Sequence, residues 1–461
     1  MKKKVLLISF LILLIFTTSI SGYFLYNTIT SLLNTNKIYK GIYIEDVYVS
    51  GLTKSQAYEI IKAKYLDTIG NKSIIINIQN DRFTYSLKYF DVNLNIKEAI
   101  DEAFSIGRNG NFLERLREIK KIYDNPVKIS LSYSYNNSKI KRISEKLALR
   151  YYKKSINASI KRINNKFVIT NSSYGTSLDY KKLAEEMKKL LDNKKGGEIN
   201  CKLNLIRPTI TEEDLRKITD VIGEFTTKFN ASNIPRSINI EVAANKINGN
   251  IVLPGETYSL SNVLSPVTVE NGYKIAKVIV GNEFVDGVGG GLCQIATTLY
   301  NAVLQAQLKV VERLPHSALV SYVPPGRDAT VASGSIDFKF KNNSDTIIYI
   351  ESFRNKDTVT VRLYGKNSHI GEVVKFENEI VEKIPYKVVY KNDPTLPKGV
   401  KKRKGIPQGG LKVKTYMSIY KDGILISKKL LSYDYYKPVD DVYLVGTKEV
   451  LTNKDKINDD R

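Results

Sequence analysis

The strongest chemical signature in this sequence is a glycine run that ends in one of its two cysteines. Residues 287–294 read GVGGGLCQ, and apolar residues then recur at helical spacing from Ile295 to Leu308. Cys293 is therefore expected at or just before a helix N-terminus, where the helix dipole and unbonded N–H groups lower the pKa of a thiol. The same N–H groups stabilise an oxyanion. The pattern predicts acyl transfer through a cysteine.

A nucleophilic cysteine also needs a base that accepts its proton. The chain contains two histidines: His316 follows the predicted cysteine helix after a short connection, and His369 lies in a polar β segment without a motif. Asp328 is predicted to orient the imidazole of His316, with Asp337 as a second candidate. Arg327 is predicted to hold a carboxylate by paired hydrogen bonds.

Other interpretations of these residues stay open at the sequence level. A buried cysteine is often inert, a glycine run can be a tight loop, His316 can be structural, and Cys201 and Cys293 can form a disulfide outside the cytoplasm. A glycan-processing enzyme would need paired carboxylates at hydrolase spacing, and no such pair stands out. Two histidines and two distant cysteines exclude a Cys/His zinc cluster unless carboxylates complete it. We expect neither a metal nor a cofactor.

The first residues predict the compartment. Lys2, Lys3 and Lys4 precede an apolar run from Val5 to about Tyr26, which is long enough to span a bilayer as a helix. The positive-inside rule then places the chain from about residue 35 outside the cytoplasm. We expect an uncleaved single-pass anchor in the cell membrane rather than a cleaved signal, because Ser19–Gly22 is a poor cleavage site.

The formal net charge of the chain is +24, from 71 basic and 47 acidic residues. Such a charge favours contact with polyanions such as nucleic acid, anionic lipid or anionic wall polymers. No nucleic-acid motif accompanies it, and the lysines are spread along the whole chain. We therefore expect no nucleic-acid partner. Affinity for wall and membrane, or a composition bias without a specific partner, both account for the charge.

The middle of the chain shows a weak internal repeat. A helix is predicted to start at Thr53, with Gln56 in capping-box position. Strands are predicted at 73–78 and 83–87. Residues 82–97 then align without gaps with residues 166–181, and each stretch leads into an amphipathic helix, at 97–104 and 181–191. This order of elements indicates two α+β repeats, with two unrelated α+β pieces as the alternative.

Later segments alternate between helical and strand patterns. Helices are predicted at 212–221, 225–229 and 237–246, and a hairpin from 336–340 into 346–351. From about residue 372 the pattern is purely β, with a strong hairpin signal at Asp422-Gly423. The fold class expected is α+β and multidomain: a transmembrane helix, two α+β repeats, an α+β domain and a small all-β module.

Several motifs between about Phe225 and Phe353 resemble the VanW domain family. They are Phe229–Ser232, Ala244–Gly249, Pro254–Ser259, Glu270–Tyr273, Gly289–Gln294, His316-Ser317 and Tyr322–Thr330. The flanks resemble peptidoglycan-binding repeats and, through segments such as Asp393–Gly399 and Val445–Lys448, the G-five β module. The resemblance implies these divisions: 1–35 anchor, 36–120 and 121–210 peptidoglycan-binding repeats, 220–370 VanW domain, 371–450 G-five-type module and 451–461 polar tail.

Some members of this family are assigned as L,D-transpeptidases that crosslink peptidoglycan, with the cysteine of the motif as nucleophile. The resemblance therefore implies 3→3 crosslinking in a Gram-positive cell wall. Cys293, His316 and Asp328 are the expected catalytic residues, and stem peptides and glycan are the expected partners. The residues expected to bind substrate are Gly290, Gly291, Gln294, Ser317, Tyr322 and Arg327. The alternative is a non-catalytic scaffold protein that binds peptidoglycan.

Overall fold

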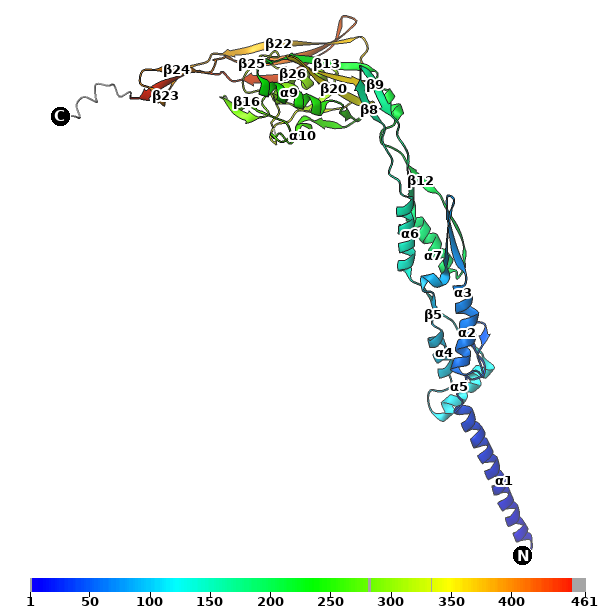
Figure 1. The fold of residues 1–461 in the computed structure, drawn as a ribbon. Helices are drawn as coiled ribbons and strands as arrows, with labels where there is room; N and C mark the ends of the chain where they lie inside the picture. The colour runs from blue at the N-terminus through cyan, green and yellow to red at the C-terminus, as the bar shows by residue number, and fades with distance from the viewer. Residues whose placement is uncertain (1, 281–282, 333, 450–461) are drawn as a thin grey trace, which may run out of the picture. The chain divides into compact units, whose positions relative to one another are not determined.

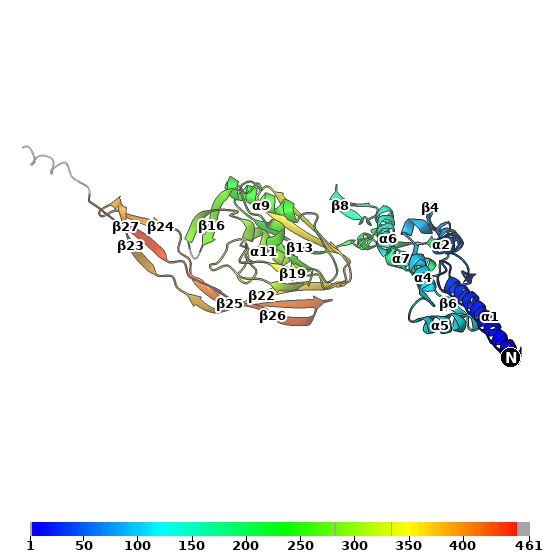
Figure 2. The same cartoon turned by 90° about the horizontal axis from the view of Figure 1, so that it is seen from below.

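The computed structural model describes residues 2–280, 283–332 and 334–449 (Figures 1 and 2). The chain divides into two units. The first contains the chain up to Ser155 together with Tyr174–Arg207, and the second contains Ile156–Ser173 together with Pro208–Arg461. The predicted polar tail, 451–461, lies outside the described residues.

The first helix, α1 (Lys2–Leu33), carries the predicted apolar run. Its side chains are exposed along nearly the whole helix, and its most apolar stretch has a mean hydropathy of 2.4. Within the described part of the chain, it is the one helix that is long and apolar enough to cross a membrane. An uncleaved anchor and a signal sequence both fit this observation.

The rest of the first unit is an α+β structure with one apolar core that contains residues from Ile38 to Ile199. Thr53 caps α2 and Gln56 completes the capping box, which confirms the predicted helix start. The helices are α2 (Lys54–Ile61), α3 (Thr68–Gly70), α4 (Ile96–Ser105), α5 (Phe112–Asp124), α6 (Asn137–Tyr151) and α7 (Tyr180–Asp192). The strands are β1 (Ile42–Ile44), β2 (Val47–Tyr48), β3 (Ser73–Ile78), β4 (Asp81–Ser86), β5 (Asn93–Leu94), β6 (Val127–Ile129), β7 (Tyr133–Ser134), β10 (Gly175–Leu178), β11 (Gly197–Cys201) and β12 (Leu203–Ile206).

Strands that are distant in the sequence share sheets in this unit. The hairpin β3–β4 is joined in parallel by β11, with Ile199 opposite Ile76. The helices predicted at 97–104 and 181–191 are present as α4 and α7. A single core therefore connects both segments, and their division into two repeats stays a prediction.

The second unit is built on a four-stranded sheet with the order β13-β21-β20-β14. Helix α9 (Ile234–Ile247) packs on β20, and the almost fully buried α11 (Leu292–Gln305) packs on β13 and β21. Figure 1 labels α9 and β20, and Figure 2 labels α11 and β13. The sheet strands are β13 (Asp220–Lys228), β14 (Ile251–Val252), β20 (Ile348–Asn355) and β21 (Thr358–Gly365). Smaller elements are α8 (Glu212–Arg216), α10 (Leu260–Leu264), β15 (Thr257–Ser259), β16 (Ile275–Val280), β17 (Glu283–Val288), β18 (Lys309–Glu312) and β19 (Lys339–Lys341).

The hairpin β8–β9 (Ser159–Ile163 and Lys166–Thr170) belongs to this second unit, although it interrupts the first in sequence. Its Phe167 meets the rings of Tyr349 and Tyr364 edge-on, with centroids 5.3 and 5.2 Å apart. Its apolar side chains share a small core with this sheet and with Leu215 of α8, so the hairpin is held there by burial rather than by sequence neighbours.

Two predictions about this unit are wrong. The segment predicted to be helical at 225–229, and the end of the helix predicted at 212–221, form β13. β13 pairs along its length with β21, and Thr226 and Thr227 suit that pleated, half-buried surface. The predicted hairpin from 336–340 to 346–351 does not form, because β19 pairs with β15 and β18 while β20 joins the larger sheet. Tertiary pairing overrides the local pattern at both places.

The C-terminal region contains only strands, in two three-stranded sheets ordered β22-β25-β26 and β23-β27-β24. The predicted hairpin at Asp422-Gly423 joins β25 to β26. The strands are β22 (Glu372–Ile384), β23 (Val388–Pro397), β24 (Lys401–Lys404), β25 (Gly410–Lys421), β26 (Ile424–Tyr436) and β27 (Asp441–Lys448). The predicted fold class, α+β and multidomain, is confirmed.

Candidate active site

Cys293 is the second residue of α11, and the glycine run forms the turn that leads into this helix. Gly291 is the N-cap, with φ +115°, and Gly289 has φ +88°. Both angles lie in the left-handed region that favours glycine. Cys293 is half-buried and its sulfur is a free thiol, as is that of Cys201. The helix start predicted from the sequence is confirmed.

Gly290 lies tightly against the neighbouring strand β16. A Cβ atom at this position would meet the carbonyl oxygen of Lys277 at 2.6 Å, which no side chain tolerates without movement. Asn239 of α9 fixes the same turn, because its Nδ2 donates to the carbonyl oxygens of Gly290 and Lys274, both at 3.0 Å. Among the described residues, the N–H groups of Gly290, Gly291 and Cys293 have no acceptor. They are therefore available to an oxyanion beside the sulfur.

The thiol of Cys293 and the ring of His316 interact closely enough that each shifts the pKa of the other. His316 is buried, and its Nδ1 lies 2.7 Å from Oδ2 of Asp328. A carboxylate partner at Nδ1 fixes the tautomer and leaves Nε2 to exchange a proton with the sulfur. The sulfur also lies 3.4 Å from the carbonyl oxygen of Val331, which accepts from the neutral thiol. Cys293, His316 and Asp328 thus form a continuous chain of proton donors and acceptors.

The pKa shifts in this chain act in the direction that favours a thiolate beside an imidazolium. Burial raises the pKa of Cys293, but hydrogen bonding to His316 and the positive charges of His316 and Arg236 outweigh burial and lower this pKa. Burial lowers the pKa of His316, yet hydrogen bonds to Asp328 and Cys293 raise it to about 9. Burial raises the pKa of Asp328, but contact with His316 and the charge of Arg313 hold it below its usual range.

Asp328 is held in place by donors from two regions of the chain. Its Oδ2 accepts from the backbone N–H of His316 at 2.7 Å, and its Oδ1 accepts from Arg313 Nη2 at 3.2 Å and from the Tyr436 hydroxyl at 2.5 Å. Arg313 in turn donates to Asp434 at 2.6 Å. The Asp328 side chain is only 1% exposed. A buried carboxylate surrounded by donors keeps its charge and its orientation.

Tyr436 and Asp434 belong to β26, so the C-terminal β region supplies part of the shell around His316 and Asp328. The Tyr436 hydroxyl also accepts from the N–H of Gly326 at 2.6 Å. The backbone N–H of Lys437 donates to the carbonyl oxygen of Ser317 at 2.7 Å. Nothing local in these strand residues signals this role, and the sequence analysis did not identify them.

The remaining residues predicted to bind substrate lie in different surroundings. Gln294 is buried, and its Nε2 donates to Thr227 Oγ1 and to the carbonyl oxygen of Lys228, both at 2.9 Å, which ties the start of α11 to β13. Tyr322 is half-buried and meets the His316 ring edge-on, with centroids 6.4 Å apart. That Gln294, Tyr322 and Ser317 contact the substrate stays a prediction.

Arg327 is buried between α11 and β22. Its Nε donates to Asn301 Oδ1 at 2.5 Å, and its guanidinium carbon lies 3.6 Å from the centroid of the Phe376 ring. Burial lowers the pKa of Arg327 to about 10. The guanidinium is thus engaged in packing, and its predicted role in holding a carboxylate remains untested.

The other candidates of the sequence analysis lie apart from the thiol. Asp337 accepts from Ser259 Oγ at 2.6 Å and from the N–H of Ser261 at 2.8 Å, so it caps α10 rather than orienting His316. His369 pairs with Glu372 at 2.9 Å. The geometry therefore places Asp328, and neither of these residues, against His316.

Arg236, which the sequence analysis missed, also contributes to the surroundings of the thiol. It lies in the first turn of α9, and its side chain passes close to Gly291. Its charge acts on both Cys293 and Tyr322. The sequence does offer a sign of this residue. Asn233 and Pro235 are typical of a helix start, and a basic residue directly after them is unusual because the helix dipole disfavours a cation there.

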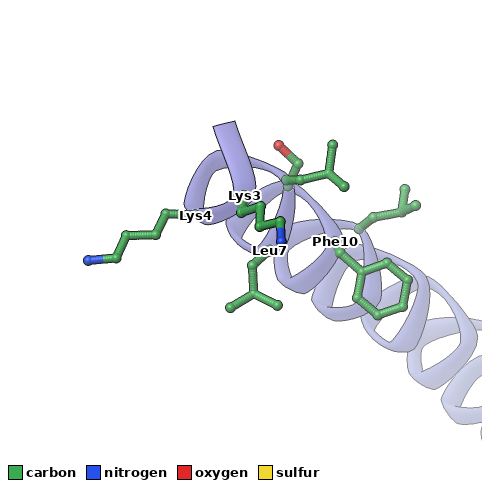
Figure 3. Close-up of a pocket in the computed structure, with 7 residues that line it drawn as sticks. Lys3, Lys4, Leu7 and Phe10 are labelled. Atoms are coloured by element: carbon green, nitrogen blue, oxygen red, sulfur yellow. The ribbon is translucent and has the colours of Figure 1, made fainter. Parts of the chain in front are cut away.

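A shallow groove on α1 is drawn in Figure 3. Its lining is mostly apolar and contains none of the residues around Cys293. The lining residues are Lys3, Lys4, Leu6, Leu7, Ser9, Phe10 and Leu13. All of them are exposed, so the groove is the surface of a bare apolar helix rather than a preformed ligand site.

Three family models match consecutive parts of the chain. They describe a peptidoglycan binding domain over residues 83–200, a VanW like protein over residues 235–364 and a G5 domain over residues 376–448. The VanW match contains Cys293, His316 and Asp328, and the G5 match contains Asp434 and Tyr436. The surroundings of Asp328 are therefore shared between two domains.

Two curated relatives match parts of the chain. YoaR of Bacillus subtilis (strain 168) is 41% identical over 183 residues, which cover 39% of this chain and 60% of YoaR. The vancomycin B-type resistance protein VanW of Enterococcus faecalis (strain ATCC 700802 / V583) is 29% identical over 113 residues, 23% of this chain and 41% of that protein. The chain thus spans less than two thirds of either relative.

Among solved structures, the G5 domain of an IgA1 protease is 22% identical and covers 18% of this chain and 99% of its own, with a TM-score of 0.13. The three family matches together support an association with the cell wall, with peptidoglycan as a partner. The chain therefore contains a region similar to VanW proteins, which follows a region that matches a peptidoglycan binding domain and precedes a region that matches a G5 domain.

Proposed function

We propose that this protein is a peptidoglycan L,D-transpeptidase that forms 3→3 crosslinks through a thioester on Cys293. The observation that carries the proposal is the chain from Cys293 through His316 to Asp328, placed at the N-terminus of α11 after a glycine turn with free N–H groups. A nucleophile, a base and an orienting carboxylate, next to oxyanion donors, are the parts that acyl transfer requires.

The first half of the reaction acylates the enzyme. The sulfur of Cys293 attacks the carbonyl carbon of the third residue of a tetrapeptide stem, and its proton passes to His316. Free N–H groups of Gly290, Gly291 and Cys293 hold the oxyanion of the tetrahedral intermediate. The amide bond to the terminal D-Ala then breaks, and His316 gives its proton to the departing amine.

The second half transfers the acyl group. The side-chain amine on the third residue of another stem attacks the thioester carbonyl, and His316 accepts its proton. Collapse of the intermediate releases the Cys293 sulfur, which takes the proton back. One amide is broken and one is formed, so no oxidant or energy source is needed. Asp328 keeps the imidazole oriented and stabilises its protonated form throughout.

The position of the enzyme follows from its other parts. We propose that α1 remains as an uncleaved membrane anchor, with the lysines at its start on the cytoplasmic side. The peptidoglycan binding domain then keeps the VanW domain near its polymeric substrate, where tethering raises the effective concentration of stems.

The test uses the full chain in detergent micelles, incubated with purified sacculi, followed by chromatography and mass spectrometry of the muropeptides. We expect new dimers joined between two third residues, together with free D-Ala. The Cys293→Ala variant should form none. Cys201→Ala removes the thiol of the first unit and should behave as the wild type does.

If the folded wild-type protein binds sacculi but leaves the muropeptides unchanged, the chain is a peptidoglycan-binding scaffold instead. Release of D-Ala without dimers would assign carboxypeptidase action to the same thiol.

A further inference from the structure

Arg236 occupies a position that electrostatics alone disfavours. It lies in the first turn of α9, where the partial positive charge of the helix N-terminus repels a cation. Within the described residues, no Asp or Glu forms an ion pair with Arg236. Burial lowers the pKa of Arg236. A cation held in such a place needs another source of stabilisation or a ligand.

The guanidinium of Arg236 is also short of a hydrogen-bond partner. Its Nη1 is completely buried and has no acceptor among the residues that the structure describes. A buried donor without an acceptor is uncommon in folded proteins, because it loses water and gains nothing in exchange. Such a donor points to a ligand that supplies the acceptor.

The surroundings of Arg236 are those of the thiol. A Cβ atom on Gly291 would lie 3.2 Å from Arg236 Cγ, so the arginine side chain passes directly beside the turn that precedes Cys293. Its charge acts on the Cys293 sulfur and on the Tyr322 hydroxyl. The unpaired donor therefore belongs to the same site as the nucleophile.

We infer that Arg236 binds the terminal carboxylate of the acyl-donor stem peptide, and thereby selects stems that end one residue after the bond to be cut. This inference rests on the proposed function. A permanent anion fits a permanently buried donor better than an oxyanion, which exists only briefly and already has three N–H donors beside it. Arginine also suits carboxylates through its paired, planar donors.

The reach of the substrate agrees with this placement. The carboxylate carbon of a terminal D-Ala is three bonds from the scissile carbonyl carbon, which standard bond lengths limit to roughly 4 Å. A cation beside the nucleophile can therefore contact that carboxylate. In a pentapeptide stem the carboxylate lies one residue further away, and in an amidated tetrapeptide it carries no charge.

The test measures binding in the Cys293→Ala background, so that no reaction consumes the ligand. Full-length protein in detergent is titrated by calorimetry with a stem tetrapeptide, its C-terminal amide and the matching pentapeptide. We expect the free acid to bind at least about tenfold more tightly than the other two. Arg236→Met should remove this preference, and Arg236→Lys should keep part of it because the charge remains.

Arg354→Met is the matched control. Arg354 pairs with Glu241 at 2.8 Å on the exposed surface of the same unit, so its loss removes an arginine away from the thiol and should leave the preference unchanged. Thermal unfolding verifies that each variant is folded. If Arg236→Met does not fold, a weakened preference in Arg236→Lys carries the same test.

Several results would overturn the inference: no binding of the acid, equal binding of acid and amide, or an undiminished preference after Arg236 is replaced. The outcome of the crosslinking assay is independent of the outcome of this binding assay. A carboxylate preference that depends on Arg236, in a protein that forms no crosslinks, would leave the anion site standing without the transpeptidase. Crosslinks with an unchanged preference would remove only the role of Arg236.

Discussion

At the scale of single residues, the reactive thiol depends on a balance between burial and charge. Burial alone opposes ionisation of Cys293, and His316 reverses the direction by hydrogen bonding and by its positive charge. His316 can hold that charge because Asp328, buried and ionised, lies against its other nitrogen. The ionisation of the proposed nucleophile therefore depends on three residues together.

Replacing His316 with Ala tests this balance. The change removes the two largest contributions that lower the pKa of Cys293, and leaves burial, which raises it, against the smaller effects of Val331 and Arg236. The thiolate should then form only at higher pH, and the alkylation profile with iodoacetamide should move upward by more than about one pH unit. The measurement uses a Cys201→Ala background, so that Cys293 is the one cysteine that iodoacetamide can alkylate.

His369→Ala is the control for this measurement, because His369 contacts Glu372 rather than the thiol. An alkylation profile that is the same with and without His316 would show that the imidazole does not activate Cys293.

At the scale of elements, two packing contacts position the reactive groups. The glycine turn before α11 lies against β16 so closely that a side chain at Gly290 would meet a backbone carbonyl at 2.6 Å. On the other side of the site, Tyr436 of β26 holds both Asp328 and the N–H of Gly326. Neither contact touches the sulfur, yet both determine where its partners lie.

Gly290→Ala should displace the turn. Atoms of Ala276 and Lys277 in β16 resist the added methyl group, so we expect a loss of about 1–3 kcal/mol in the free energy of unfolding and slower alkylation of Cys293. Denaturant unfolding and alkylation rates measure the two effects. Gly409→Ala is the control, because a Cβ there meets its nearest atom at 3.4 Å, an ordinary contact. Equal effects of the two substitutions would contradict the close packing at Gly290.

Tyr436 lies in the G5 region, and Tyr436→Phe removes the hydrogen bond that its hydroxyl donates to Asp328. A hydrogen bond to a charged group contributes about 1.5–3 kcal/mol, so we expect at least a tenfold slower reaction of Cys293 in crosslinking or alkylation, with the protein still folded. Tyr433→Phe changes an exposed tyrosine of the same strand and should have no effect. If both variants react at the wild-type rate, the G5 domain is dispensable for positioning Asp328.

At the scale of the whole molecule, the charge and the domain set act together. The domain matches support an association with the cell wall, and a net charge of +24 favours contact with polyanions. Such long-range attraction is screened by salt, whereas a shaped binding site for peptidoglycan is much less sensitive.

Retention of the full chain by purified sacculi should therefore fall as the ionic strength rises from about 0.05 to 0.5 M, because the Debye length then shrinks from about 14 to 4 Å. Sacculi stripped of anionic polymers should retain less protein at low salt and the same amount at high salt. If neither ionic strength nor removal of the anionic polymers changes retention, the domains alone account for the binding.

Much of the local structure was predictable because its causes are local. The capping box at Thr53, the hairpin at Asp422-Gly423 and the helix start at Cys293 each depend on a few neighbouring residues, and all three are present. The strand β13 was not predictable in this way. Its conformation is determined by pairing with β21, more than a hundred residues away in the sequence.

The sequence by itself determined that Cys293 follows a glycine turn at a helix N-terminus and that His316 was the better-placed base. Only the tertiary structure decided that Asp328 rather than Asp337 orients the imidazole, and that Arg236 and Tyr436 join the site. The physical reason is that a helix start depends on adjacent residues, whereas a buried charge is stabilised by whichever distant donors the packed domains bring to it.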